Sequence, residues 1–91
     1  MKFDYTPGPW LPTVHLDVIT EDGSPIARLA STRGKYEYEE ANARLIAAAP
    51  ELLEASHAAW NCICELPPTQ ARVEVAQMLQ AAIEKATGET P

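Results

Sequence analysis

The chain has 91 residues, and this length favours a single domain over residues 1–91, because two cores of half the size would bury too little apolar surface to offset chain entropy. Thirteen acidic residues against seven basic ones give a net charge of −6, which argues against a partner such as duplex DNA, whose phosphates need clustered Lys and Arg. Hydrophobic residues make up 46% of the chain, too many for a disordered tail.

The first residues lack the apolar core of a signal peptide, and no stretch approaches the roughly twenty apolar residues that span a bilayer. We therefore expect no membrane association and a cytoplasmic location. In a reducing compartment Cys62 and Cys64 should remain thiols.

Composition divides the chain near residue 36. Three of the four glycines precede this point, whereas thirteen of the fifteen alanines follow residue 40, and alanine is the best helix former. All of the net charge lies in residues 36–91. This order predicts an α+β fold, in which an N-terminal β-hairpin portion (1–35) packs on the two to three helices of a helical portion (36–91).

The first elements form a predicted hairpin of residues 14–19 with residues 26–30. Apolar and polar residues alternate in the first strand, and the Asp22–Gly23 dipeptide is a strong signal for a tight turn. The face expected to be buried consists of Val14, Leu16 and Val18. Residues 35–38 also alternate, so they fit either a short third strand or the first turn of a helix.

A helical pattern begins at about residue 39. Pro50 is well placed in the first turn of a second helix, which the Pro67–Pro68 pair ends. Thr69 is a suitable N-cap for a third helix, and Gly88 a natural end. The short link predicts that the last two helices form an antiparallel hairpin. The apolar face expected for the first helix consists of Ala41, Leu45 and Ala48, with Ile46 and Ala49 flanking it.

No residue pattern indicates catalysis, a cofactor or a metal. His57 and Cys64 are two helical turns apart, roughly 10 Å, which is too far for a nucleophile and its base. Cys62 and Cys64 point to different sides of a helix, so they cannot hold one metal ion together. We interpret both as buried or half-buried thiols, and we expect the protein not to be an enzyme.

A basic cluster is the clearest candidate for ligand binding. Arg28, Arg33 and Lys35 lie close together in sequence, and Arg44 follows about one helix later. With aromatic side chains at its rim, this cluster could hold a small phosphorylated molecule. The simpler interpretation is a charged loop that makes surface ion pairs with Glu37 and Glu39. The aromatic candidates at the rim are Trp10, Tyr36 and Tyr38.

The last two helices carry more apolar surface than a monomer of this size can bury. Such a patch usually marks an interface, and self-association through a two-fold axis would let the patch meet its own copy. We therefore predict a homo-oligomer. The candidate interface residues are Val75, Met78, Leu79, Ala82 and Ile83.

Two segments resemble a family of small proteins that recurs in bacteriophage and prophage genomes. One is TPGPW at residues 6–10, and the other is ANARLIAAAPELLEA at residues 41–55. The hairpin turn at residues 22–27 is similar as well, so the resemblance covers about residues 6–55. It implies a phage or prophage accessory protein that acts stoichiometrically in host takeover or counter-defence, in the host cytoplasm.

Three hypotheses about function follow. The first is a non-enzymatic binding protein of phage origin that forms a homo-oligomer and binds a host protein. The second is an oligomeric sponge for a (cyclic) nucleotide immune signal, in which Arg44 reaches a ligand phosphate and Asn42 bonds the hairpin backbone or lies in the site. The third is a small enzyme of unknown reaction.

Overall fold

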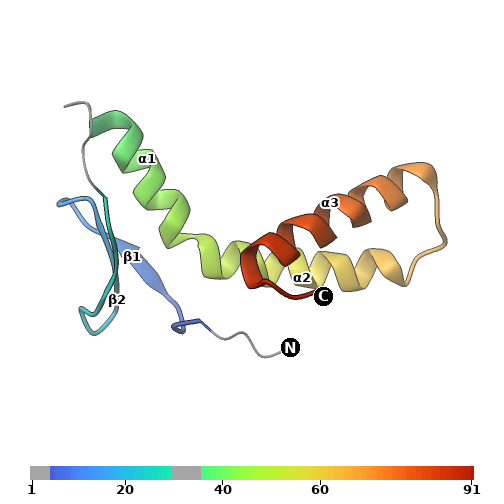
Figure 1. The fold of residues 1–91 in the computed structure, drawn as a ribbon, viewed down its shortest axis with the longest axis horizontal. Coiled ribbons are helices and arrows are strands. Elements are labelled where there is room, and N and C mark those ends of the chain that lie inside the picture. The colour runs from blue at the N-terminus through green and yellow to red at the C-terminus, as the bar shows by residue number, and fades with distance from the viewer. Residues whose placement is uncertain (1–4, 30–35) are drawn as a thin grey trace. The chain divides into compact units, whose positions relative to one another are not determined.

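The computed structural model describes residues 5–29 and 36–91, without the side chains of Tyr36 and Glu37. Three strands precede three helices, which confirms the predicted α+β fold (Figure 1). The elements are β1 (Trp10–Pro12), β2 (Asp17–Thr20), β3 (Pro25–Arg28), α1 (Tyr36–Ala47), α2 (Ala49–Cys64) and α3 (Gln70–Thr87). The chain groups into two compact units, a sheet unit at Thr6–Glu51 and a helical unit at Leu52–Pro91, to which Tyr5 also belongs.

The sheet is antiparallel, with β2 in the centre between β1 and β3. Trp10 lies opposite Thr20, and Asp17 lies opposite Arg28. The predicted turn at Asp22–Gly23 is confirmed, and Gly23 has a φ of +89°, a conformation that glycine adopts at little cost. The strand β1 was not predicted, because it has only three residues and its pairing with β2 is non-local.

The first strand of the predicted hairpin is shorter than expected. Residues 14–16 form a turn, and β2 begins only at Asp17. The prediction that Val14 shares a buried face with Leu16 and Val18 is wrong, because the turn leaves Val14 92% exposed. The alternation of apolar and polar residues extends over residues 14–18, but the strand begins only at Asp17. The pattern alone therefore does not reveal that residues 14–16 form a turn.

The core of the sheet unit lies between α1 and the sheet, since α1 contacts β1 and β2. Its buried centre is Val18 with Ala43 and Ala47 of α1, and Trp10 and Ile46 pack against it. Alanine side chains let the helix approach the strands closely. The predicted centre of the face is therefore wrong, because Ala41 is exposed and Leu45 is 63% exposed, whereas Ile46 at its predicted flank does pack against the core.

The alternative of a strand or a helix near residue 36 is resolved in favour of the helix. The helix α1 begins at Tyr36, three residues before the predicted start, while Lys35 lies outside the described residues. Composition predicted that α1 belongs to the helical portion of the chain. In the structure α1 packs against the sheet instead and belongs to the sheet unit.

The ends of the remaining helices follow the local signals in the sequence. Pro50 lies in the first turn of α2. The Thr69 side chain accepts a hydrogen bond from the Arg72 amide at 3.2 Å and so caps α3. Gly88 ends that helix with a φ of +76°, and its amide donates to the Glu84 carbonyl at 2.7 Å. Between the two helices the chain turns back, so α3 reverses the direction of α2 (Figure 1).

The helical unit has a thin core. Ile83 is fully buried, whereas the other apolar side chains on the same face of α3, Ala76 and Leu79, are only half-buried. On α2 the half-buried side chains recur at helical spacing, at Leu53, Ser56, His57, Trp60 and Ile63. Cys62 and Cys64 are free thiols and both are exposed, so the prediction that they are buried or half-buried is wrong.

The Asp22 carboxylate predicts a dependence of stability on pH. Hydrogen bonds from the Thr20 hydroxyl and from the Ser24 amide lower the pKa of Asp22 below its ordinary value of 3.8. Since folding lowers this pKa, the carboxylate stabilises the fold above about pH 4 and loses that contribution as the pH falls through its folded-state pKa. We expect Asp22→Asn to lower the melting temperature at neutral pH, by an amount that shrinks on acidification, while Glu21→Gln leaves the profile unchanged. A constant difference at every pH would contradict this assignment.

Candidate functional site

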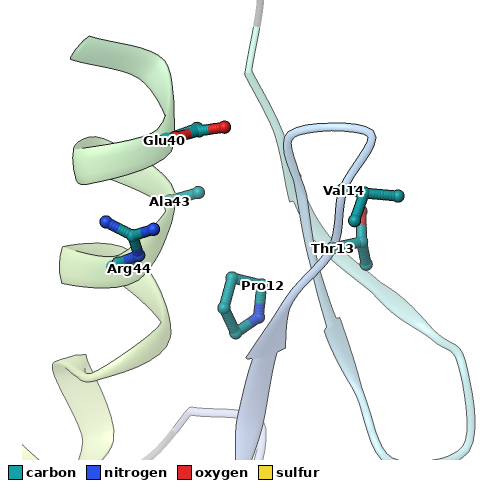
Figure 2. Close-up of a pocket in the computed structure, with 6 residues that line it drawn as sticks. All are labelled: Pro12, Thr13, Val14, Glu40, Ala43 and Arg44. Atoms are coloured by element: carbon teal, nitrogen blue, oxygen red, sulfur yellow. The ribbon is translucent and has the colours of Figure 1, made fainter. Parts of the chain in front are cut away.

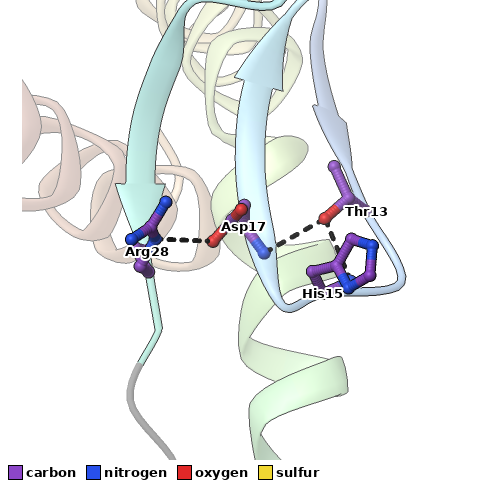
Figure 3. Close-up of polar contacts among 4 residues, drawn as sticks. All are labelled: Thr13, His15, Asp17 and Arg28. Carbon is purple, nitrogen blue, oxygen red and sulfur yellow. Dashed lines mark hydrogen bonds and ion pairs between the residues drawn. The ribbon is translucent and has the colours of Figure 1, made fainter.

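The turn that joins β1 to β2 is held together by hydrogen bonds among its own residues. The Thr13 hydroxyl accepts hydrogen bonds from the amides of His15 and Asp17, at 3.1 and 3.3 Å (Figure 3). The Thr13 amide donates to the Asp17 carbonyl at 2.9 Å, and the Leu16 amide donates to the Thr13 carbonyl at 3.2 Å. Four hydrogen bonds thus fix five residues in one conformation.

These bonds hold Leu16 in a backbone conformation that bulky residues rarely adopt. Its φ is +64°, which costs on the order of 1–3 kcal/mol for a side chain with a Cβ. The Leu16 side chain is buried, while Val14 and His15 are presented to solvent. The turn therefore combines a strained residue with an exposed apolar side chain.

A shallow surface pocket lies beside this turn. It has a volume of about 220 Å³ and is enclosed by residues 12–14 on one side and by α1 on the other (Figure 2). The helix contributes Glu40, Ala43 and Arg44. Because Glu40 and Arg44 are one helical turn apart and oppositely charged, the wall of the pocket carries no net charge. The pocket is therefore better suited to bind an apolar surface, or a surface of mixed polarity, than a phosphate group.

The predicted ligand-binding residues lie in different surroundings. Arg28 pairs with Asp17 at 3.3 Å across the β2–β3 ladder, and its side chain is 86% exposed (Figure 3). Arg44 lines the pocket and Asn42 is exposed on α1. Trp10 packs against the core, and its indole N–H donates to the Thr6 carbonyl at 3.0 Å. The other predicted positions, Arg33, Lys35 and the side chain of Tyr36, lie outside the described residues.

The two segments that carry the resemblance to phage proteins meet in the sheet unit. A Cβ atom on Gly8 would lie 3.3 Å from the Cβ atom of Pro50, so a larger residue there would have to displace Pro50 by a few tenths of an ångström. Trp10, two residues later, packs against the buried Ala43 and Ala47. The shared residues therefore build the packing of the sheet unit, and the pocket borders this packed region.

A second hollow of about 350 Å³ lies between residues 6–9 and the hairpin turn. Its ionisable lining residues are Glu21 and Asp22, so it does not suit an anion. In α1 the buried Glu39 is a separate polar feature, and its Oε2 atom has no hydrogen-bond partner within the described part of the chain.

The sequence did not identify the turn at residues 13–17 as a functional candidate. Its signal is Thr13, whose hydroxyl can accept from amides two and four residues ahead, a local motif that competes with strand formation. Neither the positive φ of Leu16 nor the exposure of Val14 is revealed by the pattern of polar and apolar residues.

Neither a metal site nor a membrane span is found in the part of the chain that the structure describes. No group of three or more His, Cys, Asp or Glu side chains is placed there to hold a metal ion. No described helix is both long enough and apolar enough to cross a bilayer.

A known protein family matches almost the whole chain. The model of the family described as Salmonella phage P22 protein Y8K6 matches residues 1–90. No curated protein and no solved structure matches the chain.

Proposed function

The chain belongs to the family of Salmonella phage P22 protein Y8K6, and from this premise we propose that it is a non-enzymatic phage accessory protein that acts by stoichiometric binding. Its place of action is the cytoplasm of the infected host, and its target is a host protein of the takeover or defence machinery. The sheet unit binds the target, and the helical unit joins copies of the chain into a homo-oligomer.

The observation that carries this proposal is the strained turn that exposes Val14. Four hydrogen bonds hold Leu16 at a positive φ, and the result is a β-branched side chain that is 92% exposed beside a pocket of mixed polarity. Strain of this kind persists where the surrounding structure maintains it, and it concentrates at functional sites. An exposed apolar side chain on a rigid turn is suited to enter a cavity of a partner protein.

A nucleotide sponge is the second candidate function, and Arg44 favours it. Its side chain lines the pocket, where it could contact a phosphate. Against this stand the neighbouring Glu40 and the pairing of Arg28 with Asp17, which offset the positive charge of both arginines. We therefore rank the protein target first.

The test is to replace Val14 and measure binding to the target. Tagged protein expressed in infected cells should recover its partner at a fixed ratio of the two chains. We expect Val14→Asp to reduce this recovery roughly tenfold or more, because a charge would enter an apolar contact. The melting temperature should stay unchanged, since the side chain makes little contact with its own chain.

The matched control is Gln77→Asp, which introduces the same charge at an exposed position of α3 and should leave recovery intact. Recovery that is equal for wild type and Val14→Asp would contradict the proposed site. A rise in melting temperature with linear or cyclic nucleotides that Arg44→Ala abolishes would instead support the sponge.

A further inference from the structure

The helical unit exposes a second apolar surface on each of its helices, beside the half-buried faces already described. On α2 this surface has the spacing 3-4-3-4 that is typical of a helix seam, and all of its members are exposed. They are Leu52, Ala55, Ala59, Cys62 and, just after the helix, Leu66. We call these residues the α2 stripe.

The helix α3 has a corresponding surface with the spacing 4-3-4. Met78 is 71% exposed and Val75 is 44% exposed, and alanines precede and follow them. The members of this α3 stripe are Ala71, Val75, Met78 and Ala82. Of the predicted interface residues, Val75, Met78 and Ala82 therefore lie on this stripe, whereas Ile83 is fully buried and Leu79 is half-buried on the inner face.

We propose, resting on the homo-oligomer of the proposed function, that a second copy of the chain covers these stripes, with the α2 stripe of each copy antiparallel to the α3 stripe of the other. The two hairpins then form a four-helix bundle with both turns at the same end. The half-buried face of each helix packs against the other helix of its own chain, and its stripe packs against the partner subunit.

Side-chain size supports this pairing over the alternatives. Because both turns lie at one end, the end of α2 at Cys64 lies opposite Gln70 of the partner subunit, where the partner's α3 begins. This fixes the register of the two paired helices. The α2 stripe from Leu52 to Cys62 then forms four layers with the α3 stripe, and each layer contains an alanine, so larger side chains meet small ones as close packing requires. The layers are Leu52 with Ala82, Ala55 with Met78, Ala59 with Val75, and Cys62 with Ala71 of the partner subunit.

Pairing α2 with its own copy fits less well. An antiparallel α2–α2 seam would place Ala59 against Ala59 and leave space at its centre. It would also bring together acidic segments, because residues 52–66 contain Glu54 and Glu65 but no Lys or Arg. In the proposed arrangement α2 lies against α3, whose Arg72 and Lys85 balance its Glu74 and Glu84, so two acidic segments are not brought together.

The size of the surface also suits a dimer. Two helices of 16 and 18 residues, at 1.5 Å per residue and about 10 Å in width, present roughly 500 Å² per chain, which reaches the ~1,000 Å² total of a specific interface. A unit of about 40 residues with one fully buried side chain is also at the size where association commonly supplies further burial.

Disulfide cross-linking between two single-cysteine chains tests the arrangement. The first chain carries Cys64→Ser and keeps the exposed Cys62, and the second carries Cys62→Ser, Cys64→Ser and Ala71→Cys. The two chains bear tags of different mass and are mixed, unfolded and refolded together before oxidation. We expect a cross-link between unlike chains, and none when Gln77→Cys replaces Ala71→Cys in the second chain.

The outcomes separate this inference from the proposed function. Self-cross-linking of the Cys62 chain would place the Cys62 residues of two copies side by side and overturn the arrangement, as would twice the 9.9 kDa chain mass in light scattering without any cross-link between unlike chains. A monomer at micromolar concentration would overturn the homo-oligomer itself. Met78→Glu should shift the mass toward the monomer, and Gln77→Glu should not.

Discussion

Replacing Trp10 by alanine should lower the free energy of unfolding of the sheet unit by about 3 kcal/mol, the lower end of the range for a large aromatic residue. The indole is half-buried against Val18, Ala43 and Ala47, and its N–H bonds to the Thr6 carbonyl. The substitution removes both this packing and the hydrogen bond that anchors the N-terminal arm. A loss of this size is a large fraction of the stability of a small domain.

Leu11→Ala is the matched control for this prediction. Leu11 is the next residue of the same strand and is 41% exposed, so its truncation should cost less than about 1 kcal/mol. Denaturant unfolding followed by circular dichroism measures both variants. Equal losses for the two would show that Trp10 makes no special contribution to the core.

Ile83→Ala should lower the stability of the helical unit by about 3 kcal/mol. Ile83 is fully buried, and every other apolar side chain of this unit is at least partly exposed, so few neighbouring contacts can offset the cavity. Hydrogen exchange of the α3 amides gives the free energy of opening for this helix alone.

Val73→Ala serves as the control on the same helix. Val73 is 39% exposed and lies on neither stripe, and alanine favours the helix, so the change should cost less than about 1 kcal/mol. Protection of the α3 amides that is unaffected by Ile83→Ala would contradict the assignment of Ile83 as the core of this unit.

Local signals in the sequence predicted the turn between β2 and β3 and the ends of the last two helices. The Asp22–Gly23 turn, Pro50 in the first turn of α2, the Thr69 cap and the Gly88 end each depend on one residue and its own backbone. Such features need no knowledge of distant contacts. The resemblance to phage proteins is likewise confirmed at the level of a phage family.

Features that depend on non-local packing could not be predicted in the same way. The strand β1 exists because Trp10 pairs with Thr20, ten residues away. The buried face of α1 is set by Ala43 and Ala47, because the sheet selects the side on which a helix can approach closely, and the larger Leu45 remains exposed. Helical periodicity alone predicted that the face containing Leu45 is buried, because it carries no information about where the sheet lies.

The candidate site was predicted in part. Arg44 does line a pocket, but the residues opposite it, at positions 12–14, became candidates only once the turn at Leu16 was known. The pairing of Arg28 with Asp17 follows from the register of β2 and β3, which the bulge between Val18 and Ile19 shifts by one position. A sequence pattern does not reveal such a shift.

The two tryptophans are divided between the units, with Trp10 in the sheet unit and Trp60 in the helical unit, and both are half-buried. Each unit thus contains its own intrinsic fluorophore. A Trp→Phe substitution at either position leaves a protein whose emission follows the solvation of one unit during denaturation. Superimposable curves from the two single-tryptophan variants would indicate one cooperative transition, and separated midpoints would give each unit a stability of its own.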